Sequence, residues 1–189
     1  MSTIHVLYED SRQKSEFELH SLVLRCVRDA ITPSSLVLEK LVRSLPLNGV
    51  DPLLARFRSI DVEHAIAVID RDRVGEHLQP VLPRDACRQR LLVALLGTPS
   101  PRTPRRSVVL LDTNLESFLS HLATSPHFPE DLREALSRAV AKRAGARIDR
   151  DIVLRRCSTT LALREHARAF PSFGRLVDRI VELLALSST

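Results

Sequence analysis

The chain has 189 residues, of which 44% are hydrophobic and 27% are charged, a composition that supports a folded core and argues against disorder. Aromatic residues make up only 4%, so base-stacking platforms like those of single-strand-binding barrels are not expected. The net charge of +5 favours polyanionic partners, although an arginine-rich, GC-rich genome gives the same composition without such a role. The chain contains neither a P-loop motif nor the G-x-G-x-x-G dinucleotide fingerprint.

Three short aliphatic runs, each ending in acidic residues, are the most informative feature of the sequence. The runs and their acids are residues 4–8 with Glu9 and Asp10, residues 65–69 with Asp70 and Asp72, and residues 108–111 with Asp112. Continuous aliphatic runs of this length, followed by helical sequence, predict strands that are buried on both faces of a parallel sheet.

Helices are predicted between and after these strands. Ser15 and Glu18 form a capping box, and apolar residues continue from there at helical spacing to Ala30. The other helices are expected at residues 35–45, 52–57, 84–96, 115–123, 130–144, 150–169 and from Ser172 onward. The predicted fold class is therefore α/β, a small, mainly parallel, Rossmann-like sheet flanked by helices. We place this α/β domain at residues 1–124 and a helical extension, packed on the same domain, at residues 125–189.

The acids predict a shared metal site. Carboxyl ends of neighbouring parallel strands face one crevice, where α/β proteins bind ligands. If the three strands pair, Glu9, Asp70, Asp72, Asp112 and Glu116 converge there. Mutual repulsion makes such a cluster costly unless a cation lies among the carboxylates. The sequence therefore predicts a divalent metal at this edge.

Simpler interpretations exist for the individual acids. Asp72 would cap the next helix, and Glu9 would be a solvated turn carboxylate. Glu116 belongs to a second capping box that begins at Thr113, which explains it without a metal. The position of Asp70 and Asp72 directly after a strand favours the metal, because the chain leaves the pleat there and both carboxylates can reach one Mg²⁺.

Residues 98–106 form a basic loop, interrupted by prolines, just before the third strand. The loop is expected at the edge of the sheet opposite the acids. The interpretation as a solvated connector is favoured over an arm in which Arg105 and Arg106 contact phosphate.

The remaining reactive side chains predict no second site. Cys26, Cys87 and Cys157 fit neither a disulfide framework nor zinc spacing, so we expect buried free thiols in a reducing compartment. His20 and His64 are expected to be structural. No signal peptide and no apolar stretch near the roughly 20 residues that span a membrane are found, so a cytoplasmic protein without membrane contact is expected.

A glutamate after a first strand, then a strand ending in Asp-x-Asp, is the signature of the TOPRIM (topoisomerase–primase) domain. Glu9 and Asp70-Arg71-Asp72 resemble this signature. Residues 112–119 (DTNLESFL) look like the third block of TOPRIM domains in the overcoming-lysogenization-defect (OLD) nucleases and their stand-alone relatives. The resemblance spans roughly residues 4–119.

The resemblance implies a nuclease that cleaves phosphodiester bonds of DNA or RNA with Mg²⁺ or Mn²⁺. It assigns Asp70 and Asp72 to the metal with help from Glu116, and makes Glu9 the general acid or base. Arg71 and Arg73 would hold the phosphate backbone. Small TOPRIM proteins also resemble effector or accessory subunits that work beside an ATPase or another protein partner.

Two departures from the family pattern favour an alternative. Asp10 follows Glu9 where the family has Gly, and Lys142, the only Lys after the third block, has no motif around it. The alternative is a TOPRIM-like domain that binds or regulates a partner without catalysis. A receiver-like phosphoacceptor domain, suggested by Glu9, Asp10 and Asp70, is a third interpretation and needs a Lys at the end of a late strand.

Overall fold

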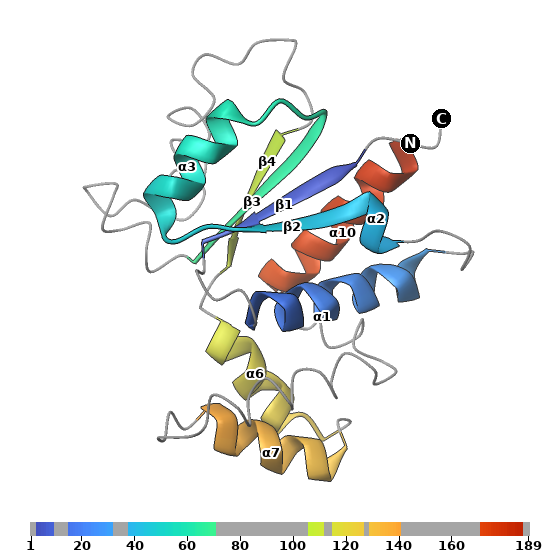
Figure 1. Cartoon of the computed structure of the whole chain (residues 1–189). Coiled ribbons are helices and arrows are strands. Elements are labelled where there is room, and N and C mark those ends of the chain that lie inside the picture. Colours follow the sequence, from blue (N-terminus) through green and yellow to red (C-terminus); the bar gives the residue numbers. More distant parts are fainter. Residues whose placement is uncertain are drawn as a thin grey trace.

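A computed structural model describes residues 3–9, 15–31, 38–70, 106–111, 115–126, 129–140 and 171–186. Its centre is a four-stranded sheet in the order β2-β1-β3-β4, and every pair of neighbours is parallel (Figure 1). The strands are β1 (Ile4–Tyr8), β2 (Val42–Pro46), β3 (His64–Asp70) and β4 (Arg106–Leu111). The predicted α/β class with a small parallel sheet is confirmed.

The three strands expected from the aliphatic runs are consecutive neighbours in this sheet. In the register, Tyr8 of β1 lies beside Val68 of β3, and Asp70 of β3 lies beside Leu111 of β4. The carboxyl ends of β1, β3 and β4 are therefore at one edge of the sheet, as the sequence predicts.

Helices cover both faces of the sheet (Figure 1). One face packs against α1 (Ser15–Ala30) and α10 (Pro171–Leu186), and the other against α3 (Val50–Ser59). The short α2 (Leu38–Leu41) runs directly into β2. The helices α6 (Leu115–Thr124) and α7 (Glu130–Val140) pack against each other.

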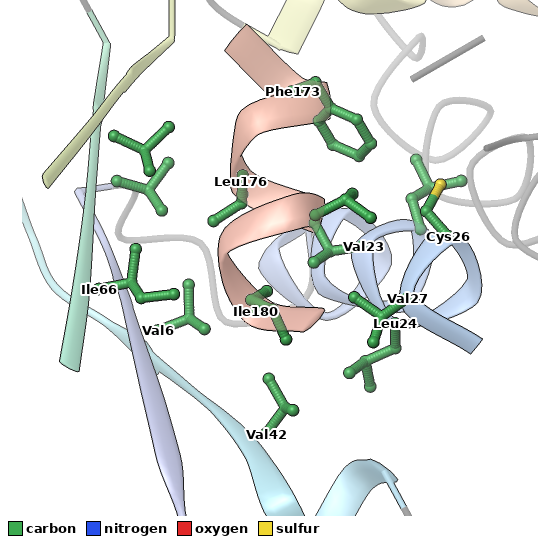
Figure 2. Packing of buried hydrophobic residues seen from close by; sticks show 14 of the residues in the cluster. Val6, Val23, Leu24, Cys26, Val27, Val42, Ile66, Phe173, Leu176 and Ile180 are labelled. Atoms are coloured by element: carbon green, nitrogen blue, oxygen red, sulfur yellow. The ribbon is translucent and has the colours of Figure 1, made fainter. Parts of the chain in front are cut away.

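Alternating strand residues divide the core into two buried clusters, because successive side chains point to opposite faces of a sheet. Figure 2 shows the first cluster, in which Val6 and Ile66 of the sheet meet Val27 of α1 and Ile180 of α10. The second cluster joins alternate residues of β1, β3 and β4 to Leu53 and Phe57 of α3. Side chains of α6 and α7 extend the first cluster: Leu122, Leu132 and Leu136.

The helix expected over residues 35–45 is wrong. Only residues 38–41 are helical, and residues 42–46 form β2. The leucines and valines of this segment recur at a spacing that suits a helix, and only Val42 of the strand is fully buried. Pairing with β1, far away in the sequence, overrides the local pattern.

The other predicted helices agree with the structure wherever it describes them. The helix α3 begins at Val50 rather than at residue 52, and α6 and α10 lie within one residue of their expected bounds. The structure describes α7 only to Val140. The helices expected at residues 84–96 and 150–169 lie outside the described residues.

Candidate functional site at the carboxyl edge of the sheet

The carboxyl edge between β1 and β3 is the topological switch point of this sheet. From β1 the chain passes through α1 to β2 on one side, and then through α3 to β3 on the other side of β1. The helices of these two connections, α1 and α3, cover opposite faces of the sheet. Open parallel sheets bind ligands outside the carboxyl ends of their strands at such a switch point.

Glu9 lies directly after β1 at this switch point and contacts the neighbouring strand. Its Oε2 accepts a hydrogen bond of 3.3 Å from the backbone N–H of Asp70, the last residue of β3. Both residues are half-buried. The structure thus brings together two of the acids that the sequence predicts to meet.

The turn that follows β2 holds the backbone of Glu9. The N–H of Gly49 donates to the Glu9 carbonyl over 2.8 Å, and the N–H of Leu47 donates to the Tyr8 carbonyl over 2.9 Å. Gly49 has φ 98° and ψ 175°, a region that is essentially restricted to glycine. A glycine between β2 and α3 therefore helps to fix Glu9, a role that the sequence did not indicate.

The structure describes little of the other predicted metal ligands, Asp72, Asp112 and Glu116. Asp112 would directly follow Leu111, which lies beside Asp70 in the register, but Asp72 and Asp112 are outside the described residues. Glu116 belongs to α6, and its side chain is not described. Within the described part of the chain, no three His, Cys, Asp or Glu residues form a group able to hold a metal. A shared metal therefore stays a prediction.

Two carboxylates can nevertheless supply part of the ligand set of a Mg²⁺ site. Mg²⁺ is bound through one or two carboxylates plus water and substrate oxygens rather than by a complete protein cage. Glu9 and Asp70 could supply those carboxylates at the switch point. The Glu9 side chain is held in place by its contact with the backbone of Asp70.

A buried hydrogen-bonded pair lies directly behind Glu9. The Tyr8 hydroxyl donates to His20 Nδ1 over 3.0 Å, and His20 Nε2 donates to the Val42 carbonyl over 3.2 Å. The two rings meet edge-on, with centroids 5.8 Å apart. This arrangement gives His20 the structural role that the sequence predicts. The sequence did not reveal its partner, although a buried Tyr hydroxyl usually needs one.

Burial lowers the pKa of His20, while the hydrogen bond to Val42 and the charge of Glu39 raise it by less. The imidazole is therefore neutral at neutral pH. A neutral ring has one donor and one acceptor nitrogen, which matches one accepted and one donated hydrogen bond. The pair joins α1, β1 and β2 just behind the switch point.

Arg106 lies at the opposite edge of the sheet, as expected for the end of the basic loop. It is the first residue of β4, and its guanidinium donates to the carbonyls of Phe57 (2.7 Å) and Ile60 (2.5 Å) at the end of α3. The last carbonyls of a helix lack partners within the helix, so this cation satisfies them. Contact of Arg106 with nucleic acid stays a prediction. Arg71, Arg73 and Arg105 lie outside the described residues.

Of the three cysteines, the structure describes Cys26, which is buried and not in a disulfide. None of the helices that the structure describes is long and apolar enough to cross a membrane. Comparison of the chain with known protein families, curated proteins and solved structures finds no match.

Proposed function

We propose that this protein is a TOPRIM-type nuclease that cleaves phosphodiester bonds of DNA or RNA with Mg²⁺ or Mn²⁺. The observation that carries the proposal is the contact between the Glu9 carboxylate and the backbone of Asp70 at the switch point. These are two positions of the family signature, and they come from separate strands of the sheet. Their meeting supports a common site but does not itself require a metal.

In the proposed site, Asp70 and Asp72 bind the metal, with Asp112 and Glu116 as further oxygen ligands. A bound Mg²⁺ would polarise the scissile phosphate and stabilise the charge that develops on it. Asp70 is suited to this role because it ends β3 at the switch point.

Glu9 would be the general acid or base of the reaction. A carboxylate at this edge can take a proton from the attacking water or return one to the leaving oxygen. The Asp70 N–H and the backbone contacts from Gly49 and Leu47 restrict its position, which such proton transfer requires. Arg71 and Arg73, directly after Asp70, would hold the phosphate backbone.

The sequence around Glu9 supports a second candidate, a TOPRIM-like subunit that binds or regulates a partner without catalysis. Asp10 replaces the glycine of the family pattern, and Lys142 has no family motif around it. Under either proposal the protein would work in the cytoplasm, and an ATPase or another protein is a candidate partner.

A cleavage assay on the full chain tests the proposal and separates the two candidates. Labelled single- and double-stranded DNA and RNA would be incubated with Mg²⁺, Mn²⁺ or EDTA. We expect metal-dependent cleavage that falls at least about 100-fold in Asp70→Asn and Glu9→Gln, the usual scale for removing one charge-stabilising group. Asp61→Asn is the matched control, because Asp61 is exposed and precedes the opposite end of β3. Equal cleavage by Asp70→Asn and wild type would overturn the proposed site, and no cleavage of any substrate would favour the non-catalytic subunit.

A further inference from the structure

Three basic side chains lie near the amino ends of β1 and β2 and the last turn of α3, away from the carboxylates. His5 of β1 and Arg43 of β2 are register partners, so their side chains point to the same face of the sheet. Leu7, two positions after His5, packs with Phe57 of α3, which identifies this face as the one covered by α3. Arg56 precedes Phe57 on that helix and is exposed.

The charges of this group act on one another. The pKa of His5 is lowered by burial first, and then by the positive charges of Arg43 and Arg56. Both guanidinium groups therefore lie close enough to His5 to act on the same imidazole. His5 Nδ1 is buried and has no hydrogen-bond partner among the described residues.

No described acid neutralises the two arginines. Three other arginines in the described ranges are in ion pairs: Arg25 with Asp29, Arg28 with Glu39, and Arg179 with Glu182. Within those same ranges Arg43 and Arg56 form no ion pair. The acid of α3, Asp51, is in the first turn of the helix, whereas Arg56 is in its last turn. Among the described residues, Arg43 and Arg56 thus carry positive charge that no ion pair balances.

We propose that Arg43 and Arg56, with His5 between them, bind the phosphate backbone of the nucleic-acid substrate. This inference rests on the proposed nuclease function and adds a path for the substrate. His5 and Glu9 are four positions apart along β1, about 13 Å at about 3.3 Å per residue. Arginine suits the contact because its planar guanidinium matches two phosphate oxygens.

Binding without chemistry tests this surface. A fluorescein-labelled 20-nucleotide single-stranded DNA, and the same sequence in RNA, would be titrated with the full chain in EDTA, which prevents metal-dependent cleavage. We expect Arg43→Gln and Arg56→Gln each to weaken binding about 3- to 10-fold at 0.1 M salt. Each should also reduce the slope of log K against log salt by about 0.7, the value for one phosphate contact on a single strand.

Arg58→Gln is the matched control, because Arg58 is also exposed and lies two positions further along α3. It should bind like the wild type. An Arg43→Gln/Arg56→Gln double variant with wild-type affinity and salt slope would overturn the proposal. The same conclusion would follow if the wild type bound neither oligonucleotide, or if it bound polyglutamate as tightly as DNA, which would indicate an acidic protein partner.

A second measurement locates the contact at His5. A phosphate beside the imidazole stabilises its protonated form, so the oligonucleotide should raise the pKa of His5. NMR titration of the histidine signals, with His5→Gln to assign the relevant one, measures this change. An unchanged pKa in the bound state would place the nucleic acid elsewhere. Failure of this proposal can be distinguished from failure of the nuclease proposal. A chain without cleavage activity can still lose affinity in the arginine variants, and an active chain can bind unchanged when the arginines are replaced.

Discussion

The Glu9 carboxylate accepts a hydrogen bond from the backbone N–H of Asp70, although the two residues are 61 positions apart. The donor belongs to the main chain, so replacement of the Asp70 side chain leaves this anchor of Glu9 in place. A glutamine at position 9 can also accept the same hydrogen bond through its amide oxygen. Asp70→Asn and Glu9→Gln therefore remove charge with little change of geometry, and their effects report on chemistry.

The metal prediction can be tested without any substrate. A ligand that binds only the folded state, at about 100 times its Kd, adds about 2.7 kcal/mol to the free energy of unfolding. For a chain of this size that corresponds to a rise of about 5–10 °C in Tm. We expect this rise when Mg²⁺ replaces EDTA, measured by differential scanning calorimetry, and a much smaller rise in Asp70→Asn. The same rise in both proteins would mean that Mg²⁺ binds somewhere other than the switch point.

Arg106 should matter for stability. Arg106→Met keeps an aliphatic side chain of similar length but removes the donors to the carbonyls of Phe57 and Ile60. Hydrogen bonds from a charged group contribute about 1.5–3 kcal/mol, so we expect urea denaturation to show a loss of about 2–3 kcal/mol. Arg58→Gln, at an exposed position of α3, should change stability by no more than about 0.5 kcal/mol. If Arg106→Met were as stable as that control, the α3 contact would be energetically unimportant.

The central part of the fold follows from local sequence. The strands β1, β3 and β4 are aliphatic along nearly their whole length, because helices cover both faces of the sheet. Parallel pairing then forces their carboxyl ends to one edge. That is why the sequence alone predicts the meeting of Glu9 and Asp70.

The features that the sequence did not predict depend on contacts between residues that are far apart in the sequence. The strand β2 has the exposed Arg43 beside the buried Val42, and it lies at the end of the sheet order. Its hydrogen-bonded pairing with β1 makes this segment a strand, which the pattern of its own residues does not predict. The juxtaposition of His5 and Arg43 depends on that pairing, so it was equally invisible in the sequence. The contact of Tyr8 with His20 requires the rotation of α1 on the sheet, which periodicity does not specify.

His20 should make folding stability depend on pH. Its pKa in the folded protein lies below the ordinary value of 6.5, chiefly because of burial. Below about pH 6.5 the unfolded chain therefore binds more protons at this position, and the free energy of unfolding falls as the pH falls. The contribution is fully present above that pH, and His5, with its lowered pKa, acts in the same direction.

Chemical denaturation at pH 7, 6 and 5 measures this dependence. His20→Gln retains a donor for the Val42 carbonyl and an acceptor for the Tyr8 hydroxyl but does not titrate. We expect the variant to lose less stability between pH 7 and pH 5 than the wild type. Parallel curves for the two proteins would show that protonation of His20 does not limit stability at low pH.

Gly49 should be the most sensitive position of the turn between β2 and α3. At φ 98° and ψ 175°, a residue with a side chain costs about 1–3 kcal/mol in backbone strain. A Cβ at this position would lie 4.0 Å from Pro52 Cδ, an ordinary van der Waals contact, so strain and not a clash would cause the loss. We therefore expect Gly49→Ala to be destabilised by about 1–3 kcal/mol in urea denaturation, whereas Asn48→Ala, at its exposed neighbour, should stay within about 0.5 kcal/mol of the wild type.

The same substitution should affect the proposed reaction, because the Gly49 N–H donates to the Glu9 carbonyl. A turn that relaxes its strain by moving this N–H also shifts Glu9 away from Asp70. We expect kcat to fall at saturating Mg²⁺ and nucleic acid, under conditions where Gly49→Ala is still folded, while oligonucleotide affinity in EDTA stays unchanged. An intact kcat in a destabilised Gly49→Ala protein would mean that the Asp70 N–H alone is sufficient to hold Glu9. A shift confined to Glu9 alters the chemical step and leaves the basic surface of Arg43 and Arg56 intact. Equal loss of kcat and of oligonucleotide affinity would therefore indicate a general disturbance of the fold around the switch point.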